Sequence, residues 1–129
     1  MKNKKHVWVA GAMCVLPFMA MAQQVEPLTD SRRLFDDGKE LFLRRDYAAA
    51  WQTLSRYVQQ KPQASLADEA AYMLACTSYE LKSPDCIQQL EHYLEQYPES
   101  RYANRVHALI ASAYFFQGQY PEAIATFKA

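Results

Sequence analysis

Three small residues recur at nearly equal intervals and constrain the fold of this chain more than any other feature. Ala50, Cys86 and Ala123 lie 36 and 37 residues apart, and Pro62 and Pro98 are also 36 residues apart. A period in the mid-thirties with two helical segments per period is typical of stacked helical hairpins. A small residue at the same place in each hairpin lets its two helices approach closely. The pattern therefore predicts an all-α repeat protein.

The apolar pattern divides the repeat into units of about 31–64, 65–99 and 100–129, each with a first and a second helix. Helical spacing of apolar residues predicts both helices of the first unit. The stripe of its second helix is Ala50, Trp51, Leu54 and Val58. In the third unit, Phe127 is expected to pack inward from the second helix. That last helix looks incomplete, because it begins near Pro121 and reaches only Ala129.

Turn residues separate these helices. Ser65 and Ser100 are predicted N-caps of the first helices of units two and three. The segment Ser83-Pro84-Asp85 predicts a second helix capped by Ser83, with proline in its first turn. Gly118 is predicted to adopt a left-handed conformation after the first helix of unit three. The turn inside unit two looks one residue shorter than the others.

At these positions the chain resembles the tetratricopeptide repeat family. The matching residues are Gly38, Ala50, Leu54 and Pro62 in unit one, Ala75, Cys86, Leu90 and Pro98 in unit two, and Ala111, Tyr114, Gly118, Tyr120, Ala123 and Phe127 in unit three. The resemblance runs from about residue 31 to the end. It implies a right-handed solenoid of antiparallel helical hairpins with about three repeats, the last incomplete. Two features depart from the family pattern: its tryptophan near the start of the first helix is absent, and Cys86 replaces its alanine.

The resemblance also implies a concave groove lined by the first helices. Its implied positions are Arg32, Phe35, Lys39, Phe42 and Leu43 in unit one, Glu69, Tyr72, Cys76, Tyr79 and Glu80 in unit two, and Arg105, Ala108, Ser112, Phe115 and Phe116 in unit three. Phe42, Tyr79 and Phe115 hold the same position in each unit, as an aromatic ladder. Such rings can anchor a bound peptide or pack the first helices against one another, and both interpretations stay open.

Residues 1–22 have the pattern of a secretory signal peptide. Three lysines precede an apolar stretch over 7–18 that is too short to span a membrane, and Ala20-Met21-Ala22 predicts cleavage after Ala22. Met13 before Cys14 argues against a lipoprotein signal. Residues 23–30 are expected to be a flexible lead-in. We expect an exported, periplasmic protein, and the segment Tyr97–Ala103 is similar to links in outer-membrane assembly lipoproteins and in the periplasmic partner of the Tol–Pal system.

The sequence contains little that indicates catalysis. After residue 22 the histidines are His92 and His107, which lie on different units without a partner at metal-ligand spacing. The same stretch has two glycines, so a glycine-rich phosphate loop is excluded. We predict no enzymatic activity, no metal and no cofactor. Cys76 and Cys86 are on the two helices of one hairpin, and a disulfide between them is left open.

Charge and architecture together predict a binding protein. Three of the 14 basic residues lie in the leader, which leaves 11 basic against 14 acidic residues and a net charge of −3. A nucleic-acid partner is therefore not expected. We expect a protein–protein interaction scaffold that binds a peptide or protein partner in its groove. Two alternatives remain: the helical N-terminal arm of a larger exported enzyme, and a structural protein that self-assembles through its exposed C-terminal repeat.

Overall fold

A computed structural model describes residues 30–60 and 64–129, without the side chains of residues 64 and 65. The predicted signal peptide, its cleavage site, the lead-in up to residue 29 and the predicted stop at Pro62 lie outside the described residues. Residues 34–129 form one compact unit, and the description below concerns that unit.

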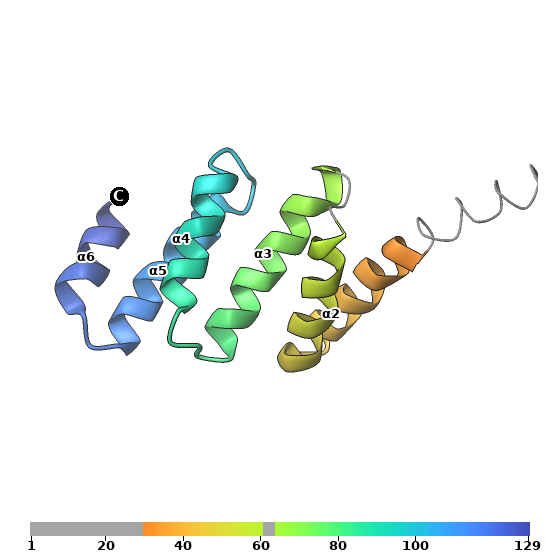
Figure 1. The fold of residues 1–129 in the computed structure, drawn as a ribbon. Helices are drawn as coiled ribbons and strands as arrows, with labels where there is room; N and C mark the ends of the chain where they lie inside the picture. The colour runs from red at the N-terminus through yellow and green to blue at the C-terminus, as the bar shows by residue number, and fades with distance from the viewer. Residues whose placement is uncertain (1–29, 61–63) are drawn as a thin grey trace, which may run out of the picture. The chain divides into compact units, whose positions relative to one another are not determined.

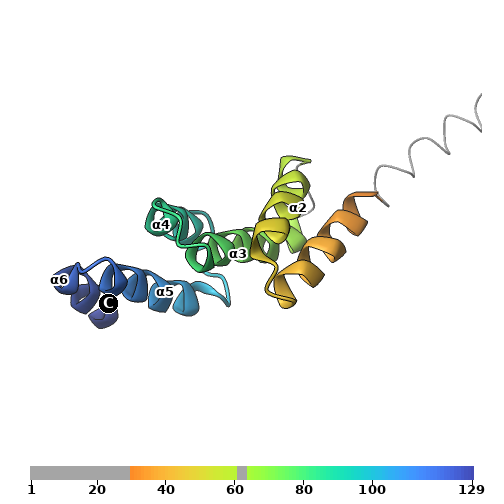
Figure 2. The same cartoon turned by 90° about the horizontal axis from the view of Figure 1, so that it is seen from below.

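Six sequential helices make up the described part of the chain (Figure 1). The first covers residues 30–43, and we call it the leading helix. It is followed by α2 (Tyr47–Gln59), α3 (Ala64–Glu80), α4 (Cys86–Gln96), α5 (Ala103–Phe116) and α6 (Tyr120–Lys128). From α2 on, each helix packs against its sequence neighbour, and α3 also contacts α5. Figure 2 shows α2 and α4 on the same side of α3. The predicted all-α fold with sequential helix packing is thus confirmed.

One turn motif ends the leading helix, α3 and α5. Arg45, Lys82 and Gly118 have φ angles of 63°, 52° and 78°, in the left-handed region. In each turn this residue donates its N–H to the carbonyl three residues earlier. The next residue donates to the carbonyl five residues earlier, and all N···O distances are 2.9–3.0 Å. This is the Schellman motif. The motif recurs after 37 and 36 residues, so the backbone repeats with the period of the sequence.

The turn inside the second hairpin differs from the other two. The N–H groups of Ala50 and Ala123 each donate to the carbonyl oxygen four residues earlier. The N–H of Cys86 donates instead to the carbonyl oxygen of Ser83, three residues earlier. The interval from the left-handed residue to the small residue is four residues here and five in the other two hairpins. However, five residues (81–85) separate α3 from α4, against three in each of the other turns, so the predicted shorter turn is wrong for the stretch between the helices. Ser83 is not the N-cap that the sequence suggested, because its own N–H still closes the end of α3 and α4 starts at Cys86.

Ser100 also has another role than the predicted N-cap. α5 begins at Ala103, after Tyr102. The Ser100 hydroxyl lies 2.8 Å from a carboxylate oxygen of Asp68 on α3 and 2.7 Å from the hydroxyl of Tyr93 on α4. Tyr93 also hydrogen-bonds Asp68, so the three side chains link α3, α4 and the segment before α5. The N–H of Tyr102 donates to the Ser100 hydroxyl at 3.2 Å, which keeps part of the predicted capping role.

The predicted small residues lie inside their hairpins. Ala50, Cys86 and Ala123 are all buried. The leading helix approaches α2 so closely that a Cβ on Gly38 would lie 2.7 Å from side-chain atoms of Leu54. Only glycine fits there without a shift of its neighbour, because real Cβ contacts are essentially never that short.

The predicted stripe of α2 is wrong at two positions. Trp51 and Val58 are 42% and 38% exposed. Tyr57 is buried in their place, with its ring centroid 5.3 Å from that of Phe35. Ala50, Leu54 and Tyr57 follow the i, i+4, i+7 spacing of a single helix face, and Trp51 and Val58 lie to one side of it.

One apolar position of the second helix is buried in the first two hairpins and exposed in the last. Leu54 and Leu90, which are 36 residues apart, have 0% exposure. Phe127 follows Leu90 by 37 residues and is 65% exposed. Its predicted inward packing is therefore wrong in this structure, because no described helix covers that side of α6.

Candidate functional site

The first-helix pocket is a recess of about 430 Å³ formed by the leading helix, α3 and α5 with their adjoining turns. It is lined by Phe42, Leu43, Arg45, Tyr47, Tyr72, Cys76, Tyr79, Glu80, Tyr102, Arg105 and Leu109. Helices far apart in the sequence thus contribute to one site. Its size is in the range of pockets that hold a small ligand or a few side chains.

Seven of the fifteen predicted groove residues meet in this pocket, and four of them are aromatic residues or arginine. They are Phe42, Tyr72, Tyr79 and Arg105. Leu43, Cys76 and Glu80, which the resemblance also placed in the groove, line the pocket as well.

The other predicted residues lie elsewhere. Phe35 is in the core, and the Lys39 ammonium pairs with the carboxylate of Glu69 at 2.7 Å. Ser112 is half-buried and Arg32 is exposed. Phe115 and Phe116 are exposed near the end of α5, and Phe116 lines a separate recess of about 470 Å³ together with Tyr79 and Cys86.

Sequence reasoning missed two aromatic side chains of the pocket, Tyr47 and Tyr102. The Tyr102 ring stacks on that of Tyr72, with centroids 4.1 Å apart and an interplanar angle of 6°. The Arg101 guanidinium lies 4.8 Å from the centroid of the Tyr102 ring and donates to its hydroxyl at 2.7 Å. Tyr102 precedes α5, so a pattern that counted only first-helix positions could not include it. The sequence feature that could have indicated Tyr102 is its position as an aromatic residue in the link between Pro98 and Ala103.

The aromatic ladder does not consist of rings stacked between first helices. Phe42 contacts Tyr47 at a centroid distance of 5.9 Å, and Phe115 contacts Tyr120 at 5.3 Å, both edge-on. Each pair therefore spans the turn within its own hairpin. At the matching position of the second hairpin Tyr79 faces a turn that carries Pro84 where the others carry tyrosine. Two of the three rings thus hold a turn together, which the sequence did not suggest.

Charge and burial set the chemistry of the pocket. Arg45 and Arg105 bring two guanidinium groups to its lining, and Glu80 brings one carboxylate. Burial raises the pKa of the Cys76 thiol to about 11, although a hydrogen bond to Tyr72 acts in the opposite direction. Burial also raises the pKa of the Tyr72 hydroxyl. Cys76 is therefore a protonated, poorly reactive thiol at neutral pH.

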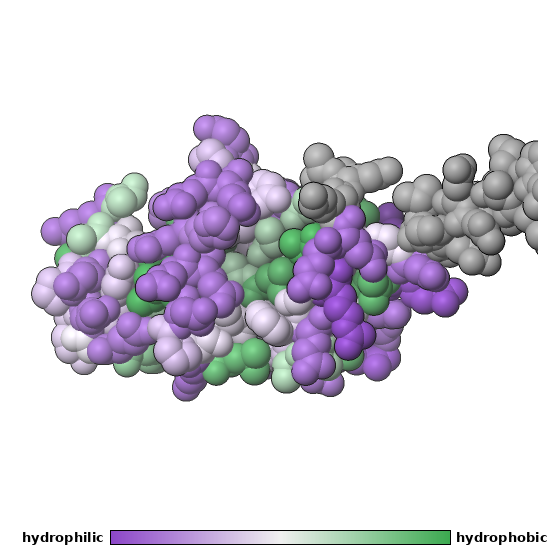
Figure 3. All heavy atoms as spheres, in the orientation of Figure 1, coloured by the Kyte–Doolittle hydropathy of each residue, from purple (hydrophilic) through white to green (hydrophobic). Residues whose placement is uncertain are grey.

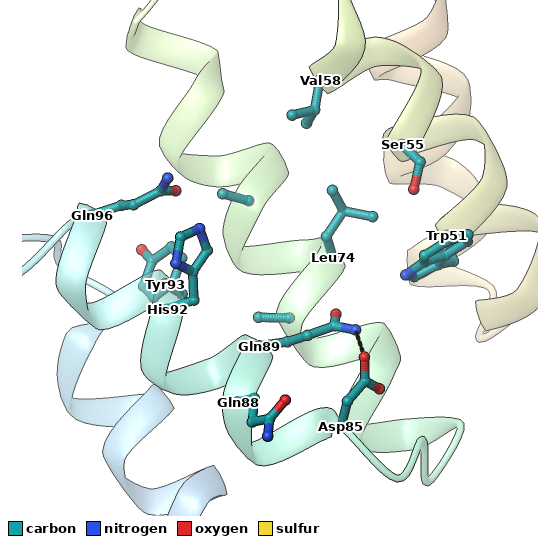
Figure 4. Close-up of a pocket in the computed structure, with 12 residues that line it drawn as sticks. Trp51, Ser55, Val58, Leu74, Asp85, Gln88, Gln89, His92, Tyr93 and Gln96 are labelled. Atoms are coloured by element: carbon teal, nitrogen blue, oxygen red, sulfur yellow. Dashed lines mark hydrogen bonds between the residues drawn. The ribbon is translucent and has the colours of Figure 1, made fainter.

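A second recess, the α2–α4 groove, has a volume of about 530 Å³ (Figure 4). Its floor is α3, with Ala71, Leu74 and Ala75. One wall is α2, with Trp51, Ser55 and Val58. The other wall comes from α4 and the turn before it, with Asp85, Gln88, Gln89, His92, Tyr93 and Gln96. In Figure 3, apolar surface is visible between the polar surfaces of α2 and α4.

The remaining chemistry of the described residues is limited. Cys76 and Cys86 are free thiols, so the disulfide left open by the sequence is not formed. Within residues 30–60 and 64–129, no three or more His, Cys, Asp or Glu side chains come together as a metal site. None of the helices described is long and apolar enough to cross a membrane.

Comparison with known proteins adds no relative. No protein-family model matches the chain, and no curated protein or solved structure is significantly similar to it. The function must therefore be inferred from the residues themselves.

Proposed function

We propose that the chain is a right-handed solenoid of the tetratricopeptide type, whose role is to bind a protein or peptide partner without catalysis. The period of the small residues and the recurrence of the Schellman turn support the repeat architecture. Six helices packed in sequence order are consistent with it. The proposed binding site is the first-helix pocket.

The observation that carries this proposal is the joint lining of the pocket by Phe42, Tyr79 and Arg105, which lie on three different helices. A site assembled from successive units is the means by which repeat proteins bind extended partners. Aromatic rings and arginine are also the residue types enriched among binding hot spots. A partner would place an apolar side chain among the rings.

Charge suggests one further property of the partner. Arg45 and Arg105 outnumber Glu80 in the lining, and a guanidinium group pairs well with a carboxylate in a two-bond geometry. An acidic side chain next to the apolar anchor would therefore fit the pocket better than a basic one.

We place this binding activity in the periplasm or at the outer membrane. Support comes from the signal-peptide pattern of residues 1–22 and from the link segment similar to that of exported repeat proteins. The mature chain would start at Gln23. Intact-mass measurement of the exported protein tests this, and a retained Met1 or a lipid on Cys14 would contradict it.

The binding proposal is tested by selecting peptides from a random display library on the purified exported protein. Selected peptides should lose affinity about tenfold or more when Phe42 is replaced by alanine or Arg105 by glutamate. Gln52→Ala, an exposed change on α2 outside both recesses, serves as the control. Thermal melts must show that the variants remain folded. If no peptide is selected, or if the selected peptides ignore both changes, the first-helix pocket is not the binding site.

A further inference from the structure

We propose that the α2–α4 groove is a second, independent binding site, which takes an uncharged peptide segment in extended conformation. It lies on a different face of α3 from the first-helix pocket. Ala71, Leu74 and Ala75 face the groove, whereas Tyr72, Cys76 and Tyr79 face the pocket. Among the described helices, α2 and α4 do not contact each other, so the floor of α3 stays open between them.

The α2 wall would bind an apolar side chain. Trp51 points into the groove from α2, near Leu74 of the floor (Figure 4). Trp51 and Val58 are among the exposed large apolar residues of the protein. Removing apolar area from water contributes about 25 cal/mol per Å², so a ligand side chain that covers these residues gains affinity. The indole N–H of Trp51 would remain available as a hydrogen-bond donor at the rim.

The α4 wall would bind a peptide backbone. Asp85, Gln89, His92 and Gln96 follow one another at intervals of four, three and four residues, so they form one stripe along α4 and its N-cap. At 1.5 Å per residue their spacing is about 4.5–6 Å, close to the roughly 6.5 Å between alternate residues of an extended chain. The whole stripe is about 16 Å long, the length of about five extended residues, so three of its four side chains can face alternate peptide groups. Carboxamides both donate and accept hydrogen bonds, as backbone peptide groups do.

The same wall selects against other ligands. Asp85 is the one carboxylate in the lining, and it already accepts a hydrogen bond from Gln89 at 2.8 Å. The lining contains no lysine or arginine. An anionic segment would lose its hydration without gaining a counter-charge, and a cationic segment would meet only the exposed carboxylate of Asp85, where an ion pair contributes little. A helical ligand has satisfied its own backbone groups and would leave the carboxamides unpaired, so an extended segment is favoured.

The experiment uses the full exported protein and blocked hexapeptides, acetylated and amidated, which contain no ionisable residue and one Leu, Phe or Trp at a varied position. Titration followed by NMR should shift the indole N–H signal of Trp51 and the side-chain amide signals of the groove glutamines. Trp51→Ala and Gln96→Ala should each weaken binding about tenfold or more. Phe42→Ala in the first-helix pocket and Gln52→Ala outside both sites should leave the affinity unchanged.

Four outcomes would overturn the proposal. The first is that no blocked peptide binds at millimolar concentration. The second is that binding occurs but is unaffected by Trp51→Ala and Gln96→Ala. The third is that a neutral linear hexasaccharide shifts the groove signals and the peptides do not. The fourth is that Phe42→Ala removes peptide binding while Trp51→Ala does not, which would place the ligand in the first-helix pocket and leave the proposed function standing.

Discussion

Replacing Lys82 with glycine should stabilise the protein. Lys82 has a φ angle of 52° in the Schellman turn that ends α3, where a residue with a Cβ is strained by about 1–2 kcal/mol. Glycine removes this strain but loses about 0.5–1 kcal/mol through the greater freedom of the unfolded chain. The net gain lies between about 0 and 1.5 kcal/mol, with a central value of about 0.75 kcal/mol. For a domain of this size the central value corresponds to a rise of about 3–6 °C in Tm.

The structure supplies a matched reverse experiment at Gly118. Its φ angle is 78° in the equivalent turn after α5, and a Cβ added there would meet no atom within 4 Å. Gly118→Ala therefore changes the backbone strain without a clash and should lower Tm by an amount similar to the rise from Lys82→Gly. Lys82→Ala is the control, because it removes the side-chain charge but retains the strained backbone.

Thermal and urea unfolding of the exported protein would measure these effects. Lys82 and Gly118 close separate turns, each through its own backbone hydrogen bonds, so their free-energy changes should add in a double variant. The reasoning is refuted if Lys82→Gly is no more stable than Lys82→Ala, or if Gly118→Ala unfolds at the same temperature as the unmodified protein.

Three further predictions concern a close helix contact, a hydrogen-bond network and a buried thiol. Gly38→Ala should cost about 1–3 kcal/mol in urea unfolding, because its methyl group would overlap Leu54, and a melt unchanged by it would mean that the two helices are farther apart. Tyr93→Phe should cost about 1–2 kcal/mol, since it removes the hydroxyl that bonds Asp68 and Ser100, and an unaltered stability would show that this network contributes little. The raised pKa of Cys76 means that the folded state holds its proton more tightly than the unfolded state. This contribution to the free energy of unfolding is complete below pH about 9 and is lost as the pH rises towards about 11. Over that range Tm should fall less steeply with pH in Cys76→Ala than in the unmodified protein, which pH-dependent melts would measure.

The all-α fold with sequentially packed helices was predictable because its signals are local. Small residues at a fixed interval and a glycine after a helix need no knowledge of tertiary contacts, and Ala50, Cys86, Ala123 and Gly118 all lie as the pattern indicates. The left-handed Lys82 could not be foreseen, since nothing in a lysine side chain favours that conformation. Lys82 adopts it within the hydrogen bonds of the Schellman turn that ends α3.

The sites were less predictable, because they depend on which of two neighbouring apolar residues turns inward. Trp51 and Tyr57 both fit an apolar stripe on α2, but in the structure Tyr57 packs its ring against Phe35 and is buried, whereas Trp51 is exposed. The α2–α4 groove was therefore not predicted from the sequence. Its polar wall contains glutamines such as Gln89 and Gln96, which by themselves are typical of solvated positions.

The exposed Phe127 has a consequence for the local stability of α6. Among the described helices α6 contacts α5 alone, and Ala123 is its one buried residue. Local opening of a helix costs little when few apolar contacts are broken. Amide protons of α6 should therefore exchange with solvent at low opening free energy, whereas those of α3, which contacts α2, α4 and α5, should exchange only near the global unfolding limit. Protection would therefore decline from α3 towards α6, and α6 would be the first of the described helices to open.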